Sequence, residues 1–461
     1  MITPRAYRFA LDPTAAQRQS LASHCGAARR AFNWGLEQVG ASLALREFEL
    51  CMFGEMRTTP LGWSLYALRR EWNQEKDKVA PCWRENSKEA YNSGLDALAR
   101  ALKNYSDSRQ GKRTGPRVGF PRFRKKGRPI GFRFTTGAIR VDGARHVVLP
   151  RLGRIRACEL TTALGERVSA GRPRILSASI SCEAGRWFVS FGCLVQRELP
   201  AGNGHQDVVG VDLGVLHLAT LSTGEVIEGP RALRAGLRKL RRLSRHCSRC
   251  RRGSRNQRKA AGRLARHHAR IAHLRRDHLH KLTTTLAKNH GVVVIEDLNV
   301  RGMSRSARGS QAKPGRRVRA KSGLNRGVLD AGFAEFRRQM EYKCRWYGAE
   351  LAVADRFFAS SKTCSRCRTV NPTLRLGDRV FHCAWCERRI DRDLNAARNL
   401  EWWGEQHLVA GSAPETENAC GGGVRPGRGP ATPAEAGTGD VPEPAGMTGG
   451  RTHRAGPPPA P

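Results

Sequence analysis

The sequence predicts a mixed α/β fold with two folded domains and a C-terminal tail, and three observations lead to this prediction. In about the first 200 residues, apolar residues at helical spacing are followed by segments in which apolar and polar residues alternate, as in strands. Two apolar runs, residues 208–212 and 292–296, each end in an acid and are separated by basic helical sequence. Two cysteine pairs follow near residues 364–386. A chain of 461 residues is long enough for two or three domains, each with its own core.

The charge balance of the chain is strongly positive. The 82 Lys and Arg against 40 Asp and Glu give a formal net charge of +42. Folding does not need this excess, because like charges oppose compaction, whereas a polyanion binds a basic surface with release of counterions. A heavily solvated surface or a basic tail is the alternative, but the positive charge runs along most of the chain. The charge therefore predicts a nucleic-acid partner.

Two features of the sequence bear on location. The first residues contain no apolar signal core, and no uncharged apolar run reaches the roughly 18 residues that a membrane span needs. Most of the 14 cysteines are scattered, which disfavours a secreted disulfide scaffold. We therefore expect a soluble protein of the cytoplasm without a membrane partner.

The N-terminal part begins with an expected strand at Tyr7–Leu11, followed by helices. Thr14 and Gln17 match a capping box, so a helix should begin directly after the strand. Helical spacing continues, with interruptions, to about residue 108. The stretch Arg109–Arg128 is then rich in Arg, Lys, Gly and Pro, which ends the helical region.

Strands of period two follow the basic stretch. Asp142-Gly143 and Glu183-Ala-Gly185 are hairpin signals between alternating apolar segments. Together with the first strand, they predict a small β-barrel or sheet over residues 1–200, with helices inserted at about residues 12–108.

Residues 205–405 predict a second domain built on buried strands. Val208–Asp212 and Val292–Glu296 have the apolar, β-branched composition of strands covered on both faces. The other expected elements are a strand over residues 216–221, basic helices over 231–290 broken near Gly253, a helix over 327–347 and a strand over 351–354. Residues 411–461, including Cys420, are rich in Gly and Pro, have few large apolar residues and predict a disordered tail.

Four cysteines have the spacing of a zinc site. Cys364 and Cys367 form one CxxC pair, Cys383 and Cys386 form another, and residues 368–382 separate the pairs. Four thiolates complete a tetrahedron around Zn²⁺ and leave no open position, so the metal should be structural. Four unrelated thiols are the alternative, which the double spacing disfavours. The adjacent His382 is not needed as a ligand, and the pair Cys247/Cys250 has no second pair near it.

Three acids are candidates for chemistry. Asp212 and Glu296 end the two apolar strands, and Asp393 opens an expected helix after the cysteines. Either strand-end acid alone would more often be a cap or a salt-bridge partner. Three carboxylates converging in a basic groove could instead hold two Mg²⁺ or Mn²⁺ ions, which activate water for phosphodiester cleavage.

Four motifs occur in a fixed order along residues 208–400. They are Val209-Gly-Val-Asp212-Leu-Gly-Val, Ile295-Glu296-Asp-Leu-Asn299-Val, the two CxxC pairs and Asp391-Arg-Asp393-Leu-Asn395-Ala-Ala. This set resembles the TnpB-type nucleases encoded by bacterial insertion sequences, relatives of the type V CRISPR effectors. Two N-terminal motifs, Phe32-Asn33-Trp34 and Gly119-Phe-Pro-Arg-Phe123, also look similar.

The resemblance implies an RNase H-like (RuvC) nuclease core with a zinc ribbon, at about residues 360–390, inserted before the third catalytic acid. Asp212, Glu296 and Asp393 would be the catalytic residues and the ligands of Mg²⁺ or Mn²⁺. The family pattern places the acid two residues before an asparagine, here Asn395, so it selects Asp393, and Asp391 would be a helix-start acid.

The resemblance also implies partners. The chain would bind a guide RNA from the transposon end and cut a guide-matched target DNA beside a short flanking motif, with one protein chain favoured per guide. It would do so in the cytoplasm of a bacterium or archaeon, in association with the nucleoid. Residues 1–200 would form a wedge-like β-barrel whose helical insertion takes part in recognition. Two other functions stay open: a transposase that transfers DNA strands, and a non-cutting, guide-RNA-bound regulator. A Holliday-junction resolvase fits least, because of the large basic N-terminal half.

Overall fold

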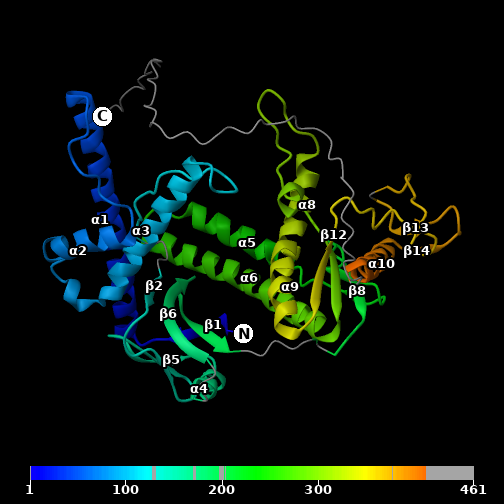
Figure 1. Ribbon diagram of the computed structural model, residues 1–461, viewed down its shortest axis with the longest axis horizontal. Coiled ribbons are helices and arrows are strands. Elements are labelled where there is room, and N and C mark those ends of the chain that lie inside the picture. The colour runs from blue at the N-terminus through cyan, green and yellow to red at the C-terminus, as the bar shows by residue number, and fades with distance from the viewer. Residues whose placement is uncertain are drawn as a thin grey trace, which may run out of the picture. The chain divides into compact units, whose positions relative to one another are not determined.

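The computed structural model describes residues 2–126, 131–169, 173–196, 202, 204–375 and 377–411 (Figure 1). The predicted tail lies outside the described residues from position 412 onward, as does Cys420, and the basic stretch Arg109–Arg128 is described as far as Lys126. Residues 1–411 form one compact unit.

A seven-stranded antiparallel sheet is built from the first 196 residues. Its hydrogen-bonded order is β2-β6-β7-β1-β5-β4-β3. The strands are β1 (Ile2–Asp12), β2 (Phe132–Phe134), β3 (Arg140–Asp142), β4 (His146–Leu149), β5 (Gly153–Ala157), β6 (Pro173–Glu183) and β7 (Arg186–Gln196). No ladder joins β2 to β3 within the described ranges. The sheet is therefore established here, and its closure into a barrel stays a prediction.

Both predicted hairpins are confirmed. β3 pairs with β4 across the Asp142-Gly143 turn, and β6 pairs with β7 across Ala184-Gly185. The last two residues have φ of 51° and 81°, as a two-residue turn with positive φ at both positions requires, and this twist matches that of the flanking strands.

Helices lie between β1 and β2, as the sequence predicts. They are α1 (Ala15–Phe53), α2 (Leu65–Val79), the 3₁₀ helix η1 (Trp83–Glu85) and α3 (Lys88–Arg109). The predicted capping box at the start of α1 is present: Thr14 Oγ1 accepts from Gln17 N, and the Gln17 side chain accepts from Thr14 N. α4 (Thr162–Ser169) follows β5. The buried side of α1 packs with α2, α3 and the inner face of the sheet in one apolar core.

A five-stranded mixed sheet forms the second half. Its order is β10-β9-β8-β11-β12, with β8 (Val208–Asp212), β11 (Val292–Glu296) and β12 (Glu350–Ala354) parallel to one another. β9 (Ala219–Leu221) is antiparallel to β8, and β10 (Val226–Ile227) to β9. The prediction of a strand over residues 216–221 was too long, because Gly214 N donates to Leu218 O and closes a turn across its first residues.

Helices cover both faces of this sheet, which explains the uninterrupted apolar strands. Val293 and Ile295 of β11 pack with α6 (Arg255–Asn289) and α9 (Phe333–Tyr347). Val294 faces the other side and packs with Leu400 of α10 (Arg392–Gly411). The remaining helices are α5 (Ala232–Arg249), which runs beside α6, α7 (Val300–Met303) and α8 (Val318–Ala331) (Figure 1).

The single helix predicted over residues 327–347 was wrong. Gly332 separates α8 from α9 and has a φ of 79°, a left-handed conformation that glycine adopts without strain. The apolar period continues on both sides of this glycine, so the pattern alone gave no sign of the break.

Candidate functional site

Two of the predicted acids lie side by side at one edge of the five-stranded sheet. Asp212 ends β8 and Glu296 ends β11, and these strands are parallel neighbours. The register pairs Val211 with Ile295, so the next residues, the two acids, lie level with each other. Carboxyl ends of parallel strands are where open α/β sheets place their ligands.

The third acid, Asp393, comes from α10. It lies in the first turn of that helix, which packs against β8. The pKa of Asp212 is raised well above its ordinary value, first by burial and then by the negative charges of Glu296 and Asp393, while Arg392 offsets part of this effect. The structure therefore brings the three carboxylates close enough for their charges to interact.

A glycine allows this approach. Gly210 in β8 lies against the backbone of α10, so that a Cβ atom there would be 1.9 Å from Ala397 O and 2.5 Å from Glu401 N. No larger residue fits at this point without moving the helix that carries Asp393.

The neighbouring acid Asp297 is occupied by other partners. Its carboxylate forms ion pairs with Arg337 and Arg356, and these two arginines lower its pKa. Glu296 instead accepts a hydrogen bond from the Ser360 hydroxyl. The sequence places Glu296 and Asp297 together at the end of β11. In the structure Asp297 is paired with two arginines, whereas Glu296 accepts from an uncharged hydroxyl.

Asp391 has a separate structural role. Its Oδ1 accepts from the backbone N–H groups of Asp393 (2.9 Å) and Leu394 (3.0 Å) at the start of α10. The interpretation of Asp391 as a helix-start acid is therefore confirmed.

The four predicted cysteines come together in a ribbon that precedes α10. The Cys364–Cys386 and Cys367–Cys383 sulfur distances are 3.6 and 3.5 Å, and all four sulfurs lie within 4.8 Å of one another. Tetrahedral Zn²⁺–thiolate bonds of about 2.3 Å place sulfurs about 3.8 Å apart, so the cluster fits a zinc ion. His382, in β13 (Val380–His382), is not in the cluster. β14 (Arg389–Asp391) pairs with β13 across the turn that holds the second cysteine pair, and it leads into α10.

Hydrogen bonding with Thr369 favours the ionised form of the Cys367 thiol. The Thr369 side chain and backbone lower the pKa of the Cys367 thiol to about 6. A thiol that ionises near neutral pH is suited to metal binding, because the thiolate is the ligand. By contrast, Cys247 and Cys250, at the end of α5, join no such cluster among the described residues.

Two buried asparagines that the sequence reasoning left without a role fasten the ribbon to α10. Asn395 and Asn399 are both fully buried and one turn apart on the helix. Their Nδ2 atoms donate to Thr363 O at 2.7 and 2.6 Å. The spacing of these residues from the cysteines in the sequence gave no sign of this contact, because it depends on how the ribbon folds back.

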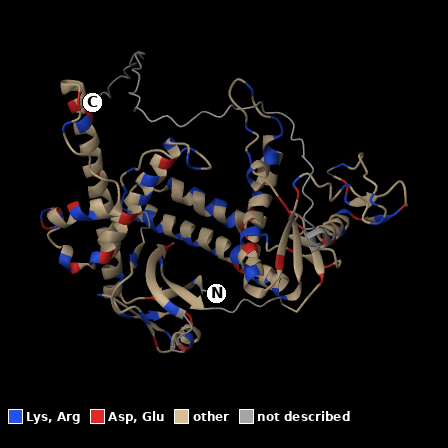
Figure 2. Cartoon of the chain, in the orientation of Figure 1, with Lys and Arg blue, Asp and Glu red and all other residues tan. Residues whose placement is uncertain are grey.

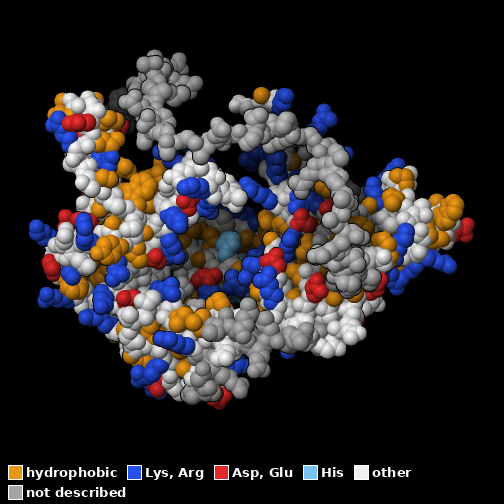
Figure 3. Space-filling model, in the orientation of Figure 1, with side chains coloured by type: hydrophobic (Ala, Val, Ile, Leu, Met, Phe, Trp, Pro, Cys, Tyr) orange, Lys and Arg blue, Asp and Glu red, His pale blue; other side chains and the backbone are white. Residues whose placement is uncertain are grey.

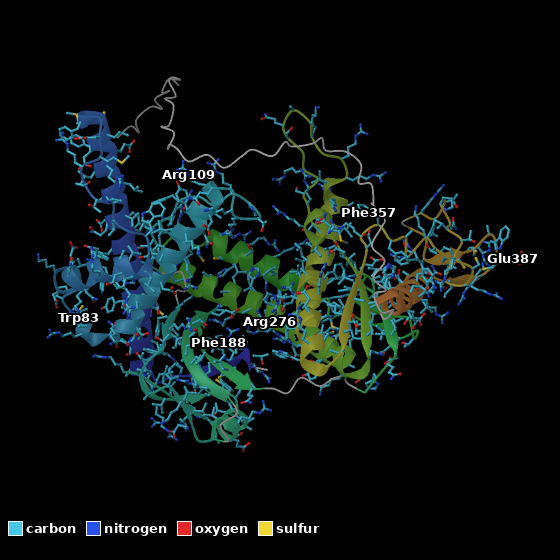
Figure 4. All side chains as sticks on the ribbon, viewed as in Figure 1. Trp83, Arg109, Phe188, Arg276, Phe357 and Glu387 are labelled. Carbon is cyan, nitrogen blue, oxygen red and sulfur yellow. The ribbon has the colours of Figure 1, made fainter. Side chains whose placement is uncertain are left out.

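The surroundings of the acids are basic and partly open. A cleft with an interior of about 400 Å³ is lined by Glu296, Asn299, Arg301 and the two arginines that bind Asp297. Phe357, just after β12, is 90 % exposed (Figure 4).

α5 and α6 together contain one acid, Asp277, among many Lys and Arg residues (Figure 2). Figure 3 shows Lys and Arg side chains spread over the displayed face.

The first N-terminal motif contacts the residue that follows the second one. Asn33 in α1 exchanges two hydrogen bonds with the backbone of Arg124, and the Arg124 guanidinium lies 3.7 Å from the centre of the Phe32 ring. This contact fixes the described end of the basic stretch to the first helix.

Known proteins resemble this chain along most of its length. The family OrfB of IS605-type elements, described as "Probable transposase", matches residues 190–307. A Cas12f1-like TNB domain matches residues 333–400, and a helix-turn-helix domain matches residues 1–40. In the described part of that last range the structure has one strand and one continuous helix.

Full-length relatives decide the family. A protein of Mycobacterium tuberculosis (strain ATCC 25618 / H37Rv), named as an RNA-guided DNA endonuclease, is 41% identical over 423 residues, which cover 88% of each chain. InsQ of Escherichia coli (strain K12), named likewise, is 33% identical over 92% of this chain and 96% of its own. The chain belongs to the TnpB-type family.

This TnpB-type chain also has a distant likeness to a solved structure, the Cas12f1–sgRNA–target DNA complex. The identity is 14%, the TM-score is 0.44, and the match covers 87% of this chain and 99% of the other. None of the helices described for this TnpB-type protein is long and apolar enough to cross a membrane.

Proposed function

We propose that this protein is an RNA-guided, metal-dependent DNA endonuclease encoded by a transposon. One observation carries the proposal: Asp212, Glu296 and Asp393 converge at one edge of a sheet in a chain with a net charge of +42. Clustered carboxylates repel one another, and a fold keeps them together mainly where they serve a metal or an acid–base reaction. The names of the full-length relatives point to the same activity.

The three acids would hold Mg²⁺ or Mn²⁺, since carboxylate oxygens are the ligands these ions prefer. Such ions supply an activated water and neutralise the charge that develops on the scissile phosphate. Burial and the neighbouring carboxylates raise the pKa of Asp212, and a bound cation would relieve the repulsion among these negative charges. The Ser360 hydrogen bond uses Glu296 Oε1, so among the described residues Glu296 Oε2 could serve as the ligand.

The remaining assignments belong to the same proposal. Residues 205–405 would be the RuvC-type nuclease domain, with a structural Zn²⁺ in the ribbon at about residues 360–390. Residues 1–200 would be the wedge-like barrel, with the recognition helices at about 12–108. The basic helices would contact RNA and DNA backbones, while guide pairing reads the sequence. One chain per guide would act in the bacterial cytoplasm on nucleoid DNA.

The test is cleavage by the full chain purified with RNA from its own transposon end. Plasmids carrying a guide-matched target and randomised flanks are incubated with Mg²⁺ or EDTA, using the wild type and Asp212→Ala. Guide- and Mg²⁺-dependent cuts beside one flanking motif, absent in the variant, are the expected result. Bound RNA without cutting would indicate a regulator, and strand transfer of transposon ends would indicate a transposase. Either outcome would overturn the proposal.

A further inference from the structure

The hydroxyl of Ser360 contacts one of the three proposed metal-binding acids. Ser360 lies in the turn between β12 and the ribbon and is 3 % exposed. Its Oγ donates to Glu296 Oε1. A carboxylate that accepts a buried hydrogen bond on one oxygen is held in one orientation, and such support is what metal-binding carboxylates usually need from the protein.

The Ser360 backbone is bound to α10 at the same time. Asn399 Nδ2 donates to Ser360 O at 2.7 Å. The same helix carries Asp393 six residues earlier. A short chain of contacts therefore runs from Glu296 through Ser360 and Asn399 to the helix of Asp393, and it fixes the position of one acid relative to another.

The cysteine ribbon begins where this chain of contacts ends. Asn399 Nδ2 also donates to Thr363 O, and Asn395 Oδ1 accepts from Ser365 N at 2.9 Å. These two bonds flank Cys364, the first thiol of the cluster. The ribbon fold and the Glu296 orientation thus depend on one turn, residues 359–365.

We propose that Ser360 is a positioning residue for the metal site, and that the ribbon sets the orientation of Glu296 through the turn at residues 359–365. The inference rests on the proposed function, because it assigns metal binding to Glu296. Without the Ser360 hydroxyl, Glu296 samples other rotamers, and divalent ions bind about 10-fold more weakly.

The measurement is Mn²⁺ binding by electron paramagnetic resonance on the full chain, with the signal of Asp212→Ala subtracted as background. Ser360→Thr and Ser360→Val have nearly the same shape and differ in the hydroxyl, so any steric cost is common to both. Thr58→Val is the control for the loss of a hydroxyl that donates to a carboxylate, because Thr58 Oγ1 donates to Glu49 Oε2 at 3.0 Å, outside the three acids.

We expect Ser360→Thr to bind Mn²⁺ close to wild-type affinity, Ser360→Val to bind about 10-fold more weakly, and Thr58→Val to be unchanged. The Mg²⁺ midpoint for cleavage should shift in the same order. Equal affinity of the Thr and Val variants would overturn this inference and leave the proposed function standing. No Asp212-dependent binding in the wild type would overturn the metal site itself.

Discussion

Replacing Gly210 by alanine should disable the site without touching any acid. The new Cβ would lie 1.9 Å from Ala397 O, whereas real Cβ atoms essentially never approach closer than 3.0 Å. The backbone of α10 must therefore retreat by about 1 Å, and Asp393 moves with it. A misplacement of this size costs about 100-fold in rate, and overpacking costs about 1–3 kcal/mol of stability.

The assay is guide-dependent cleavage together with thermal unfolding. Gly404→Ala is the matched control, because its Cβ would also enter the interface between α10 and the sheet. There it meets methyl groups of Val294 (2.5 Å) and Val208 (3.1 Å), which can move without shifting the helix backbone. We expect a similar loss of stability but at most a few-fold loss of rate. Wild-type cleavage by Gly210→Ala would refute the reasoning.

Three further predictions concern stability and zinc. Burial lowers the pKa of Lys343 from 10.5 to about 8, so between these pH values the unfolded chain binds more protons at this residue than the folded chain does. The contribution of Lys343 to the free energy of unfolding should therefore rise with pH by up to about 3 kcal/mol. The buried thiols of Cys25 and Cys344, whose pKa is raised to about 12, act in the opposite direction, so the rise should appear in denaturant titrations as the difference between the wild type and Lys343→Met. Asp330 accepts hydrogen bonds from Leu233 N (2.9 Å) and Arg234 N (3.3 Å) at the start of α5. Asp330→Ala should therefore lower the free energy of unfolding by about 1–3 kcal/mol and speed amide exchange at the start of α5. Asp330→Asn should change both little. Cys383→Ser should abolish zinc binding, as measured by native mass spectrometry, and should make residues 360–391 sensitive to proteases. If the variant kept one zinc ion per chain, the four-cysteine site would be contradicted.

The sequence was most informative where a residue's role depends on its immediate neighbours. The apolar runs before Asp212 and Glu296 predicted strands with acids at their ends, and the structure has both strands with the predicted bounds. The spacing of the cysteines likewise predicted the cluster, because each CxxC turn aims two thiols at one point.

Contacts between distant segments could not be predicted in this way. Ser360 lies 64 positions from Glu296, and nothing in its neighbourhood distinguishes it from other serines. The two arginines that neutralise Asp297 come from α9 and from the end of β12, so the choice of Glu296 over Asp297 came from the motif and not from charge.

Local backbone geometry was the other source of error. The break at Gly332 interrupts a continuous apolar period, and a single glycine inside a helical pattern is compatible with either a kink or an unbroken helix. The turn across residues 214–218 similarly replaces half of a predicted strand, although its residues include apolar ones.

The most direct test of the account is cleavage by two variants in the same motif, Asp393→Asn and Asp391→Asn, in the guide-loaded protein with Mg²⁺. The charge of Asp393 raises the pKa of Asp212 more than the charge of Asp391 does, and Asp391 accepts hydrogen bonds at the start of α10. We predict that Asp393→Asn abolishes cutting, whereas Asp391→Asn retains it at a reduced rate. Cutting by Asp393→Asn at the wild-type rate would contradict the assignment of the three acids.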